Sequence, residues 1–467
     1  MARQSSRLNK ATVDTAPAAE SSIANTLKNG TPKGKAAKLK VNDDAADDEA
    51  LVSPEQTKSA KKRKATQSNI EDEEPAVEEP KTTKKRKTGA KAKTENLMAL
   101  AKRTIINTLN KSMYIGAHVS SAGGVQNSIN NAVHIGANAF ALFLKSQRKW
   151  ANPPIASDAL NGFLSLSKEH KFEVHKHCLP HGSYLVNLAA AEKDKADQAY
   201  NSFLDDLQRC ESLGVKLYNF HPGNTNGQDR AEAIGRIAKQ LNKAHKATKT
   251  VVAVLEIMAG QGNVIGCTFE DLRDIIALVE DKTRVGVCID TCHAFAAGYD
   301  LRAPEAFADT MSKFNSVVGA EYLKAFHLND SKAPFDSRRD LHANIGTGFL
   351  GLRAFHNVVN HDAFQGMPMV LETPIDKKGA DGKTFEDKQV WADEIKLLES
   401  LIGMDPESEE FKALETRLQA QGASERSKIQ DQVDRKSAKG TKGAKKAAPK
   451  KGRGKKKAES SDEEDSE

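Results

Sequence analysis

The stretch RVGVCIDTCHAFAAGYD, residues 284–300, decides the fold, because an apolar strand pattern runs directly into an aspartate, a cysteine and a histidine. Apolar residues alternate from Val285 to Ile289 as in a buried strand, and Asp290 falls where that strand is expected to end. Asp290 and His293 would point to opposite faces of a continuing strand, so the backbone must leave the strand there if both serve one site. An aspartate in this place more often caps a helix, and only its recurrence elsewhere favours a shared site.

The same arrangement recurs along the middle of the chain, where apolar strand-like runs alternate with helical patterns. Such alternation is typical of parallel strands joined by helices. The predicted strands cover residues 114–120, 139–145, 173–179, 217–222, 251–256, 285–290, 322–329 and 369–372. The predicted helices include residues 124–134, 191–213, 230–247, 269–280, 304–318 and 390–401. Eight strand–helix units predict an α/β fold, namely one (β/α)8 TIM barrel.

An open doubly wound sheet is the alternative architecture. A sheet of that kind that binds a dinucleotide carries a glycine fingerprint after its first strand. Residues 118–122 read HVSSA at that place instead, which favours the barrel.

Composition separates the middle of the chain from its ends. Residues 1–110 are rich in Lys, Glu, Ala, Ser and Thr and contain no aromatic residue, so they cannot bury enough apolar surface to offset chain entropy. Residues 423–467 are similar and end in a basic run followed by an acidic tip. We therefore expect disordered, charged N- and C-terminal tails around a barrel domain of residues 111–403, with a further helix at 404–422.

Charge and targeting signals suggest where the protein acts. The formal net charge of +7 suits a polyanionic partner, although a charged tail is often only a solvated tail. Basic clusters at residues 61–64 and 84–87 predict recognition by a nuclear-import receptor, with nonspecific nucleic-acid contact as the alternative. Arg3, Arg7 and Lys10 precede the first acidic residue and keep a mitochondrial transit peptide as a second option. We expect a nuclear protein, with the mitochondrion as a second location.

Cysteine usage and hydropathy point to an intracellular protein that does not enter a membrane. No apolar run approaches the roughly 20 residues that a bilayer span needs, and the N-terminus lacks the apolar core of a signal peptide. All cysteines lie in the patterned region without the small secreted scaffold that disulfides stabilise, so we expect free thiols. They are Cys178, Cys210, Cys267, Cys288 and Cys292.

Nearly every predicted strand ends in a residue that can bind a metal, on the face where barrel enzymes carry their sites. A lone histidine is usually a hydrogen-bonded structural residue, but all thirteen lie between His118 and His361, and chance does not readily account for so many at strand ends. The candidates are His118, His181, His221, Glu256, Asp290, His293, His327, Asp340, His342 and Glu372.

The type and number of these side chains indicate zinc. Imidazole and carboxylate donors without a set of cysteines favour a catalytic zinc site or a similar divalent ion. Without His118, five imidazoles and four carboxylates would fill three sites at about three or four ligands per ion, especially if Glu256 bridges two. Asp340 and His342 are two residues apart, so in extended chain they face the same way. Three dications against four carboxylates leave about +2, which suits a phosphodiester substrate better than a neutral sugar.

Several motifs resemble the endonuclease IV family of apurinic/apyrimidinic (AP) endonucleases, over about residues 112–401. The motifs are the opening stretch together with IGAHVSSAGG, LPHGSYLVNL, NFHPG, AGQGN, FHLND and VLET, in the family's order. The extra charged tails are typical of a fungal-type member. The resemblance implies that hydroxide attacks the phosphodiester 5' to a base-free sugar and leaves a 3'-hydroxyl. It also implies 3'-phosphodiesterase activity that cleans blocked 3' ends.

The resemblance further implies a role for individual residues. Three zinc sets follow from it, with Glu256 as the metal-bridging catalytic residue and His118 beside the ligands, not among them. The sets are His181, His221 and Glu256; Glu256, Asp290, His327 and Glu372; and His293, Asp340 and His342. Three positions, Arg148, Tyr184 and Leu185, are implied to insert into double-stranded DNA at an AP site. We expect a monomer whose residues 111–403 suffice for activity.

One position departs from the family pattern, and two other functions remain as alternatives. The family usually has asparagine after the bridging glutamate, where this chain has Ile257. The loss of the asparagine either lets the Glu256 side chain move more freely or has no effect, if Ile257 packs behind the strand end. A sugar isomerase of the same barrel type would also place histidines and carboxylates around divalent ions. A noncatalytic chromatin binder would use the basic tails and leave the ligand set idle.

Overall fold

The computed structural model describes residues 98–446. The basic clusters at 61–64 and 84–87, residues 1–97 of the predicted N-terminal tail and the acidic tip of the chain lie outside these residues.

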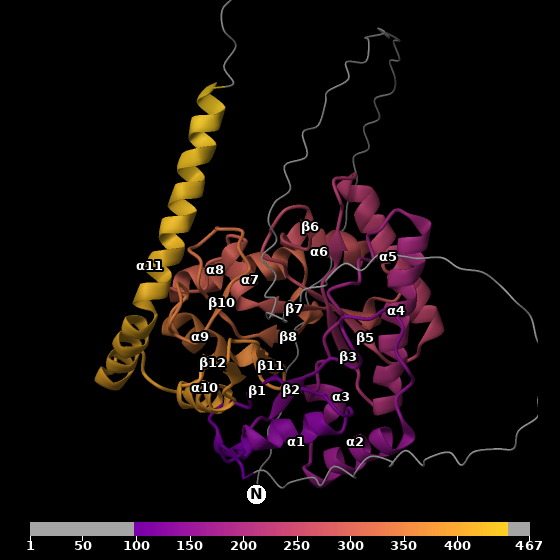
Figure 1. The fold of residues 1–467 in the computed structure, drawn as a ribbon, viewed down its shortest axis with the longest axis horizontal. Helices are drawn as coiled ribbons and strands as arrows, with labels where there is room; N and C mark the ends of the chain where they lie inside the picture. The colour runs from indigo at the N-terminus through magenta and orange to yellow at the C-terminus, as the bar shows by residue number, and fades with distance from the viewer. Residues whose placement is uncertain (1–97, 447–467) are drawn as a thin grey trace, which may run out of the picture. The chain divides into compact units, whose positions relative to one another are not determined.

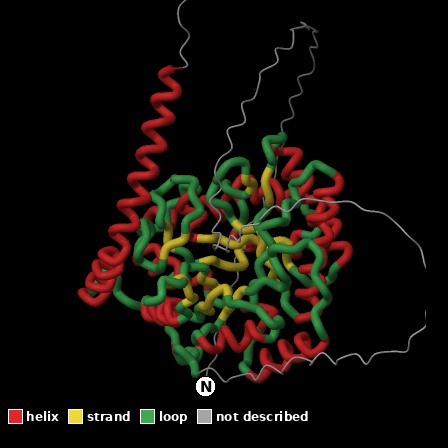
Figure 2. The backbone as a smooth tube through the Cα atoms, viewed as in Figure 1, coloured by secondary structure: helices red, strands yellow, loops and turns green. Residues whose placement is uncertain are grey.

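Within the described residues, seven strands form one parallel sheet at the centre, with helices around them (Figures 1 and 2). Each neighbouring pair runs parallel, as the alternation of strands and helices predicts. The order is β2 (Ala139–Ala141), β1 (Tyr114–His118), β11 (Pro368–Leu371), β8 (Leu323–His327), β7 (Val285–Asp290), β5 (Val252–Glu256) and β3 (Leu217–Phe220).

The segment 178–181 joins the two outer strands and closes the barrel. The N–H of Leu179 donates to the carbonyl of Phe140 at 2.9 Å, and the N–H of Asn219 donates to the carbonyl of Pro180 at 2.9 Å. Isolated parallel bridges pair Cys178 with β2 and His181 with β3. The predicted (β/α)8 TIM barrel is confirmed.

The predicted third strand at 173–179 is wrong over most of its length. Residues Val174–His177 form the short helix α3, and only Cys178 and the residues after it reach the sheet. The ring of His177 stacks on Tyr114 with centroids 3.5 Å apart. The three successive polar residues at 175–177 interrupt the strand pattern, and this contact across the fold stabilises the helical turn.

The predicted helices cover the sheet with their apolar faces. Helix α5 has the predicted bounds, and α4 ends at Gly214, whose φ of 71° gives the left-handed cap that glycine favours. The main helices are α1 (Asn127–His134), α2 (Ser157–Glu169), α4 (Lys193–Leu213), α5 (Arg230–Ala247), α6 (Phe269–Leu278), α7 (Thr291–Ala296), α8 (Pro304–Val317), α9 (Leu352–Val359), α10 (Gln389–Ser400) and α11 (Glu409–Lys446). Short 3-10 turns are η1 (Ile106–Thr108), η2 (Lys282–Arg284), η3 (Ala320–Tyr322) and η4 (Asp362–Phe364).

Three short antiparallel pairs lie in the loops that follow the strands. The first joins β4 (Gly223–Asn224) and β6 (Val264–Ile265), and the second joins β9 (Asp330–Ser331) and β10 (His342–Ala343). The third is an exposed hairpin of β12 (Asp376–Lys378) and β13 (Thr384–Glu386).

Both predicted domain boundaries differ from the structure. The body begins before residue 111, because Leu100 donates its N–H to the carbonyl of His134 at 2.8 Å and the Arg103 guanidinium lies 3.8 Å from the centre of the Phe172 ring. At the other end, α11 continues beyond the predicted helix 404–422 to Lys446. The apolar stripe that marks the helix in the sequence ends near Leu418, whereas the residues after it contact the body through polar side chains such as Glu425 and Arg426.

None of the helices within residues 98–446 combines the length and the apolar character that a bilayer crossing requires.

Candidate metal centre

The carboxyl ends of the barrel strands bring the predicted ligands together. Parallel strands of a barrel end on one face, so residues far apart in the chain become neighbours there. His118, Glu256, Asp290 and His327 are the last residues of β1, β5, β7 and β8, while His221 and Glu372 directly follow β3 and β11.

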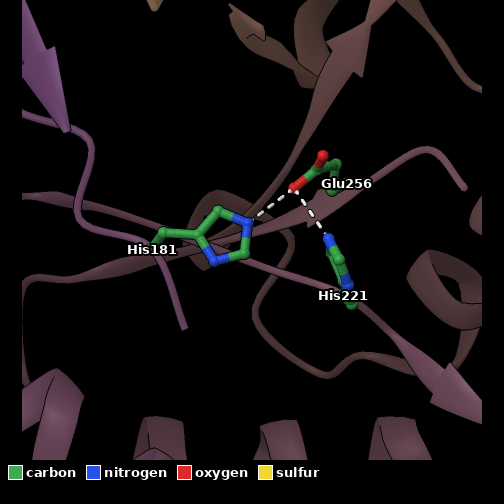
Figure 3. Close-up of side chains that lie close together, drawn as sticks. All are labelled: His181, His221 and Glu256. Atoms are coloured by element: carbon green, nitrogen blue, oxygen red, sulfur yellow. Dashed lines mark hydrogen bonds and ion pairs between the residues drawn. The ribbon is translucent and has the colours of Figure 1, made fainter. Parts of the chain in front are cut away.

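The first predicted set gathers around one oxygen of a fully buried glutamate (Figure 3). Glu256 Oε2 lies 3.1 Å from His181 Nε2 and 3.5 Å from His221 Nε2. The Asn219 amide donates to the same oxygen at 2.5 Å. His181 Nδ1 pairs with the carbonyl of Gly182 at 2.7 Å, which leaves Nε2 free to face the site.

The second predicted set gathers around the other oxygen of Glu256. His327 Nδ1 lies 3.2 Å from Glu256 Oε1, 3.3 Å from Glu372 Oε2 and 3.8 Å from Asp290 Oδ2. One donor atom from each of the four residues lies within 4.8 Å of the others. Glu256 therefore presents Oε2 to the first set and Oε1 to the second, with Oε1 also 3.3 Å from His293 Nδ1, an arrangement that allows the carboxylate to bridge two ions.

The third predicted set lies beside the first two. Asp340 Oδ1 is 3.1 Å from His293 Nε2 and 3.3 Å from His342 Nε2. His293 Nδ1 pairs with the carbonyl of Ile257 at 2.9 Å, so its Nε2 points toward Asp340. The side chain of Ile257 is itself fully buried in the hydrophobic core. The residue that departs from the family pattern thus reaches the site through its backbone only.

Asp290 caps a helix and faces the predicted ligands at the same time. Its Oδ1 accepts the N–H of His293 at 2.8 Å and so begins α7 directly after β7. Its Oδ2 faces His342 Nε2 at 3.8 Å and accepts a hydrogen bond from the amide of Asn329 at 2.6 Å. The two roles suggested by the sequence therefore do not exclude each other.

Burial and the pairing of histidines with carboxylates set the charges of the site. Burial disfavours the ionised carboxylate, but the nearby imidazole of His327 holds the pKa of Glu256 well below its ordinary value. Burial likewise disfavours the charged ring of His342, yet Asp340 raises the pKa of that ring to about 9. Burial lowers the pKa of His221 to about 4, so this ring is neutral and able to bind a metal.

The donor atoms fit divalent ions in two further respects. Among the described residues, every ion pair of Glu256, Asp290, Asp340 and Glu372 is made with a histidine, and none with lysine or arginine. The buried Nε2 atoms of His293 and His342 lie close to Asp340 but find no hydrogen-bond partner within residues 98–436. A divalent ion bound between these side chains would balance the carboxylates and give the two ring nitrogens a partner.

The residues predicted to contact DNA lie at the rim of this site. Arg148 is exposed, Tyr184 is 60% exposed and Leu185 is 42% exposed. The hydroxyl of Ser183 donates to the carbonyl of Gln147 at 2.8 Å and joins the two loops that carry them. The predicted insertion of these residues into a duplex stays a prediction.

Sequence reasoning did not identify the amides that hold the carboxylates. The side-chain amides of Asn219 and Asn329 donate to Glu256 and Asp290. The side-chain oxygen of Asn329 accepts the backbone N–H of Glu372 at 2.8 Å. Their signal in the sequence is an asparagine within two residues of a strand-end histidine. His118, expected beside the ligands, has Nδ1 3.0 Å from Glu372 Oε1.

A cysteine also lies near the third set. Cys292 groups with Asp290 and His342 within 4.8 Å. Burial raises the pKa of its thiol, and Sγ faces the carbonyl of Leu341 at 3.6 Å. We do not count this protonated thiol among the ligands.

The chain is similar to known proteins in both sequence and fold. The family model described as a xylose isomerase-like TIM barrel matches residues 129–401. The chain is 46% identical to apurinic-apyrimidinic endonuclease 1 of Saccharomyces cerevisiae over 286 residues, which are 61% of this chain and 75% of the relative. It is 48% identical to the protein named "Probable endonuclease 4" of Campylobacter curvus over 289 residues, 62% and 98% of the two chains. The crystal structure of endonuclease IV from Thermus thermophilus superposes with a TM-score of 0.52 at 29% identity, over 62% of this chain and 99% of that one.

Proposed function

The chain belongs to the endonuclease IV family of AP endonucleases and is a hydrolase of DNA repair that cleaves at AP sites, and from this premise we propose that zinc serves its reaction. We propose hydrolysis of the phosphodiester 5' to a base-free sugar, which leaves a 3'-hydroxyl. A 3'-phosphodiesterase activity that cleans blocked 3' ends would use the same site.

The observation that carries the proposal is the division of Glu256 between two sets of donors. One carboxylate oxygen faces His181 and His221, and the other faces His327. Two ions held in this way would activate a water and offset the charge that gathers on the phosphate. The third set, around Asp340, would hold a further ion close to the departing oxygen.

The residues of the chain prepare the site for that chemistry. Asn219 and Asn329 donate to Glu256 and Asp290 and fix the direction of their remaining lone pairs. The carbonyl of Gly182 sets which ring nitrogen of His181 faces the site. Because these side chains are buried, little reorganisation is needed when the substrate binds.

We further propose how the substrate is recognised and where the protein acts. The partner would be double-stranded DNA with an AP site or a blocked 3' end, and Arg148, Tyr184 and Leu185 would enter the duplex there. An abasic nucleotide has no base to unpair, so its extrusion costs least. The protein would act as a monomer, in the nucleus through an import receptor that binds its basic clusters, with the mitochondrion as a second location.

The two alternatives explain less. A sugar isomerase shares the barrel, but the relatives that share almost half of the residues are named as endonucleases. A chromatin binder would leave ten converging ligand-type side chains without a role.

The deciding experiment is incubation of the purified protein with a duplex that carries one AP site, without added magnesium. We expect incision on the 5' side, a 3'-hydroxyl product and about three zinc ions per chain by elemental analysis. A duplex without the AP site is the control. Cleavage only on the 3' side, strict magnesium dependence or one ion or fewer per folded chain would contradict the proposal.

A further inference from the structure

Two of the predicted ligands stand beyond the barrel strands, on the segment after β8, where His342 begins the two-residue strand β10 that pairs with β9. We define the ligand loop as residues 330–351, between β8 and α9, which carry Asp340 and His342. The other members of the three sets lie at, or within a few residues of, segments that belong to the barrel wall. A sheet fixes its own backbone, but a ligand on a loop needs other groups to hold it in place.

Two carboxylates hold the inner side of the ligand loop, one from its own first residue and one from α10. The carboxylate of Asp330 accepts the N–H groups of Gly348 at 2.8 Å and Leu350 at 3.0 Å. Glu394 of α10 accepts the N–H of Ile345 at 2.8 Å and the amide of Asn344 at 3.1 Å. These bonds satisfy N–H groups of the turn that follows His342. The carbonyl groups of the same turn face outward.

Helix α11 binds those carbonyl groups from the outside. Gln419 donates to the carbonyl oxygens of Gly346 at 2.8 Å and Gly348 at 3.0 Å. The guanidinium of Arg426 donates to the carbonyl of Thr347. Three successive carbonyls of the turn therefore depend on two side chains of one helix.

The helix lies in close contact with the same turn. A methyl group added at Gly422 would lie 1.9 Å from the carbonyl oxygen of Thr347, which is backbone and cannot move aside. Phe411 and Leu418 are buried and anchor the first turns of α11 against the body. Gly422 therefore marks the place where only glycine permits this approach.

Two contacts reach the ligand residues still more closely. Lys332 donates its backbone N–H to the carbonyl of Leu341, between the two ligands, at 2.9 Å, while its ammonium pairs with Glu425 of α11 at 3.2 Å. Arg339, next to Asp340, donates to Gln432 at 3.3 Å. In Figure 1, α11 runs alongside the region of β10 and continues past it.

We propose that α11 is a clamp that positions Asp340 and His342, with Gln419, Gly422 and Arg426 as its positioning residues. The proposal rests on the proposed function only in that the third set binds zinc. Helix α11 begins at Glu409, after the last residue of the family match at 401. The clamp would thus make the third ion depend on a segment outside the matched barrel.

The test is a zinc titration of metal-free protein against a fluorescent chelator, without DNA. The wild type is expected to show three binding steps. In Gly422→Ala, one step should weaken by about 10- to 100-fold and the other two should not change. Alanine favours a helix over glycine, so this variant strengthens α11 itself and disturbs only its contact with the loop. Gly235→Ala in α5, where nothing lies within 4 Å of the added methyl, is the matched control.

A second pair of variants separates positioning from folding. Arg426→Ala should weaken the same single step, and Arg426→Lys, which keeps a donor, should restore part of the affinity. Equal weakening of all three steps, or none in Gly422→Ala and Arg426→Ala alike, would overturn the clamp. A wild type that binds no zinc would instead refute the proposed function, and the clamp with it.

Discussion

The predicted ligands fall into two groups that the fold holds in different ways. Barrel ligands such as Glu256 and His327 end strands of the central sheet, and their side chains are completely buried. The loop ligand Asp340 keeps 34% of its side chain exposed, more than any barrel ligand, while His342 at 19% is close to the barrel ligand His221 at 22%. Their place depends on side chains from β9, at the start of the loop itself, and from the later helices α10 and α11.

This difference teaches that the site is not uniformly rigid. A barrel strand end is fixed by backbone hydrogen bonds to a strand on each side, whereas the ligand loop has only the two-residue pairing of β9 with β10 and depends for the rest mainly on side-chain contacts. Changes at the barrel ligands should therefore damage the whole centre. Changes around the loop should remove one ion and leave the others.

The largest effect is expected for Glu256→Ala. It removes the carboxylate that two of the three sets share, so both should lose metal, and the rate of AP-site incision should fall by about 10⁴-fold. Elemental analysis and single-turnover gels measure the two effects. His342→Ala is the comparison, which should cost one ion only. Equal metal loss in the two variants would remove the distinction between barrel and loop ligands.

A smaller effect is expected when the chain is cut after Gly403. The sequence suggests that residues 111–403 suffice, but the structure shows that this cut removes α11 with the buried Phe411 and Leu418. We expect roughly 3 kcal/mol less stability in a urea titration and the loss of the third ion. A chain that ends at residue 436 keeps the docked part of α11 and should behave as the full chain. Full zinc content in the shorter fragment would show that the ligand loop keeps its conformation without α11.

These two cases show how far the sequence reaches. The periodicity of apolar residues predicts the strands, and strand ends of a parallel barrel must converge, so the barrel ligands can be placed on one face without coordinates. Their division into sets came from the family resemblance. This reasoning does not extend to Asp290. The sequence leaves open whether Asp290 caps a helix or faces the ligands, and only the structure shows that one carboxylate oxygen does each. The supports of the loop could not be predicted. Gln419 and Arg426 look like ordinary surface residues of a polar helix until their partners are known.

The same limit explains the error at α3. Residues 173–179 read EVHKHCL, so three polar residues in succession at 175–177 interrupt the strand pattern, but nothing in the local sequence shows that a helical turn forms instead. The stacking of His177 on Tyr114 comes from a residue about sixty positions away. A contact between residues so far apart in the chain leaves no periodic pattern in the sequence around either of them.

A third prediction tests recognition apart from metal binding. Tyr184 lies over the barrel ligands, with its ring centre 5.3 Å from those of His181 and His221. Tyr184→Ala and Arg148→Ala should keep full zinc content and weaken binding of AP-site DNA by about 1 to 3 kcal/mol for each lost stacking contact. A fluorescent base opposite the lesion reports unstacking. If both variants perturb that base as the wild type does and incise at the same rate, the two residues do not enter the duplex.

The smallest effect concerns Glu394, which joins the two regions. Its carboxylate binds Thr373, next to the barrel ligand Glu372, and also Asn344 and Ile345 of the ligand loop. Burial raises the pKa of Glu394 from 4.5 to about 7, although these hydrogen bonds oppose the shift. Between those values the folded protein holds a proton that the unfolded chain releases.

The sign of the pH dependence follows from this difference. Because the folded state binds the proton more tightly, the contribution of Glu394 to stability falls as the pH rises from about 4.5 to about 7 and is constant above that. Glu394→Gln cannot titrate, so its stability relative to the wild type should increase over the same range, by about 1.4 kcal/mol per pH unit at most. Urea titrations at pH 5, 6, 7 and 8 measure the difference, in which the pH dependence of metal binding largely cancels. The exposed Glu410→Gln is the control, and a difference that stays flat from pH 5 to 8 would show that the joint between barrel and loop carries an ionised carboxylate throughout.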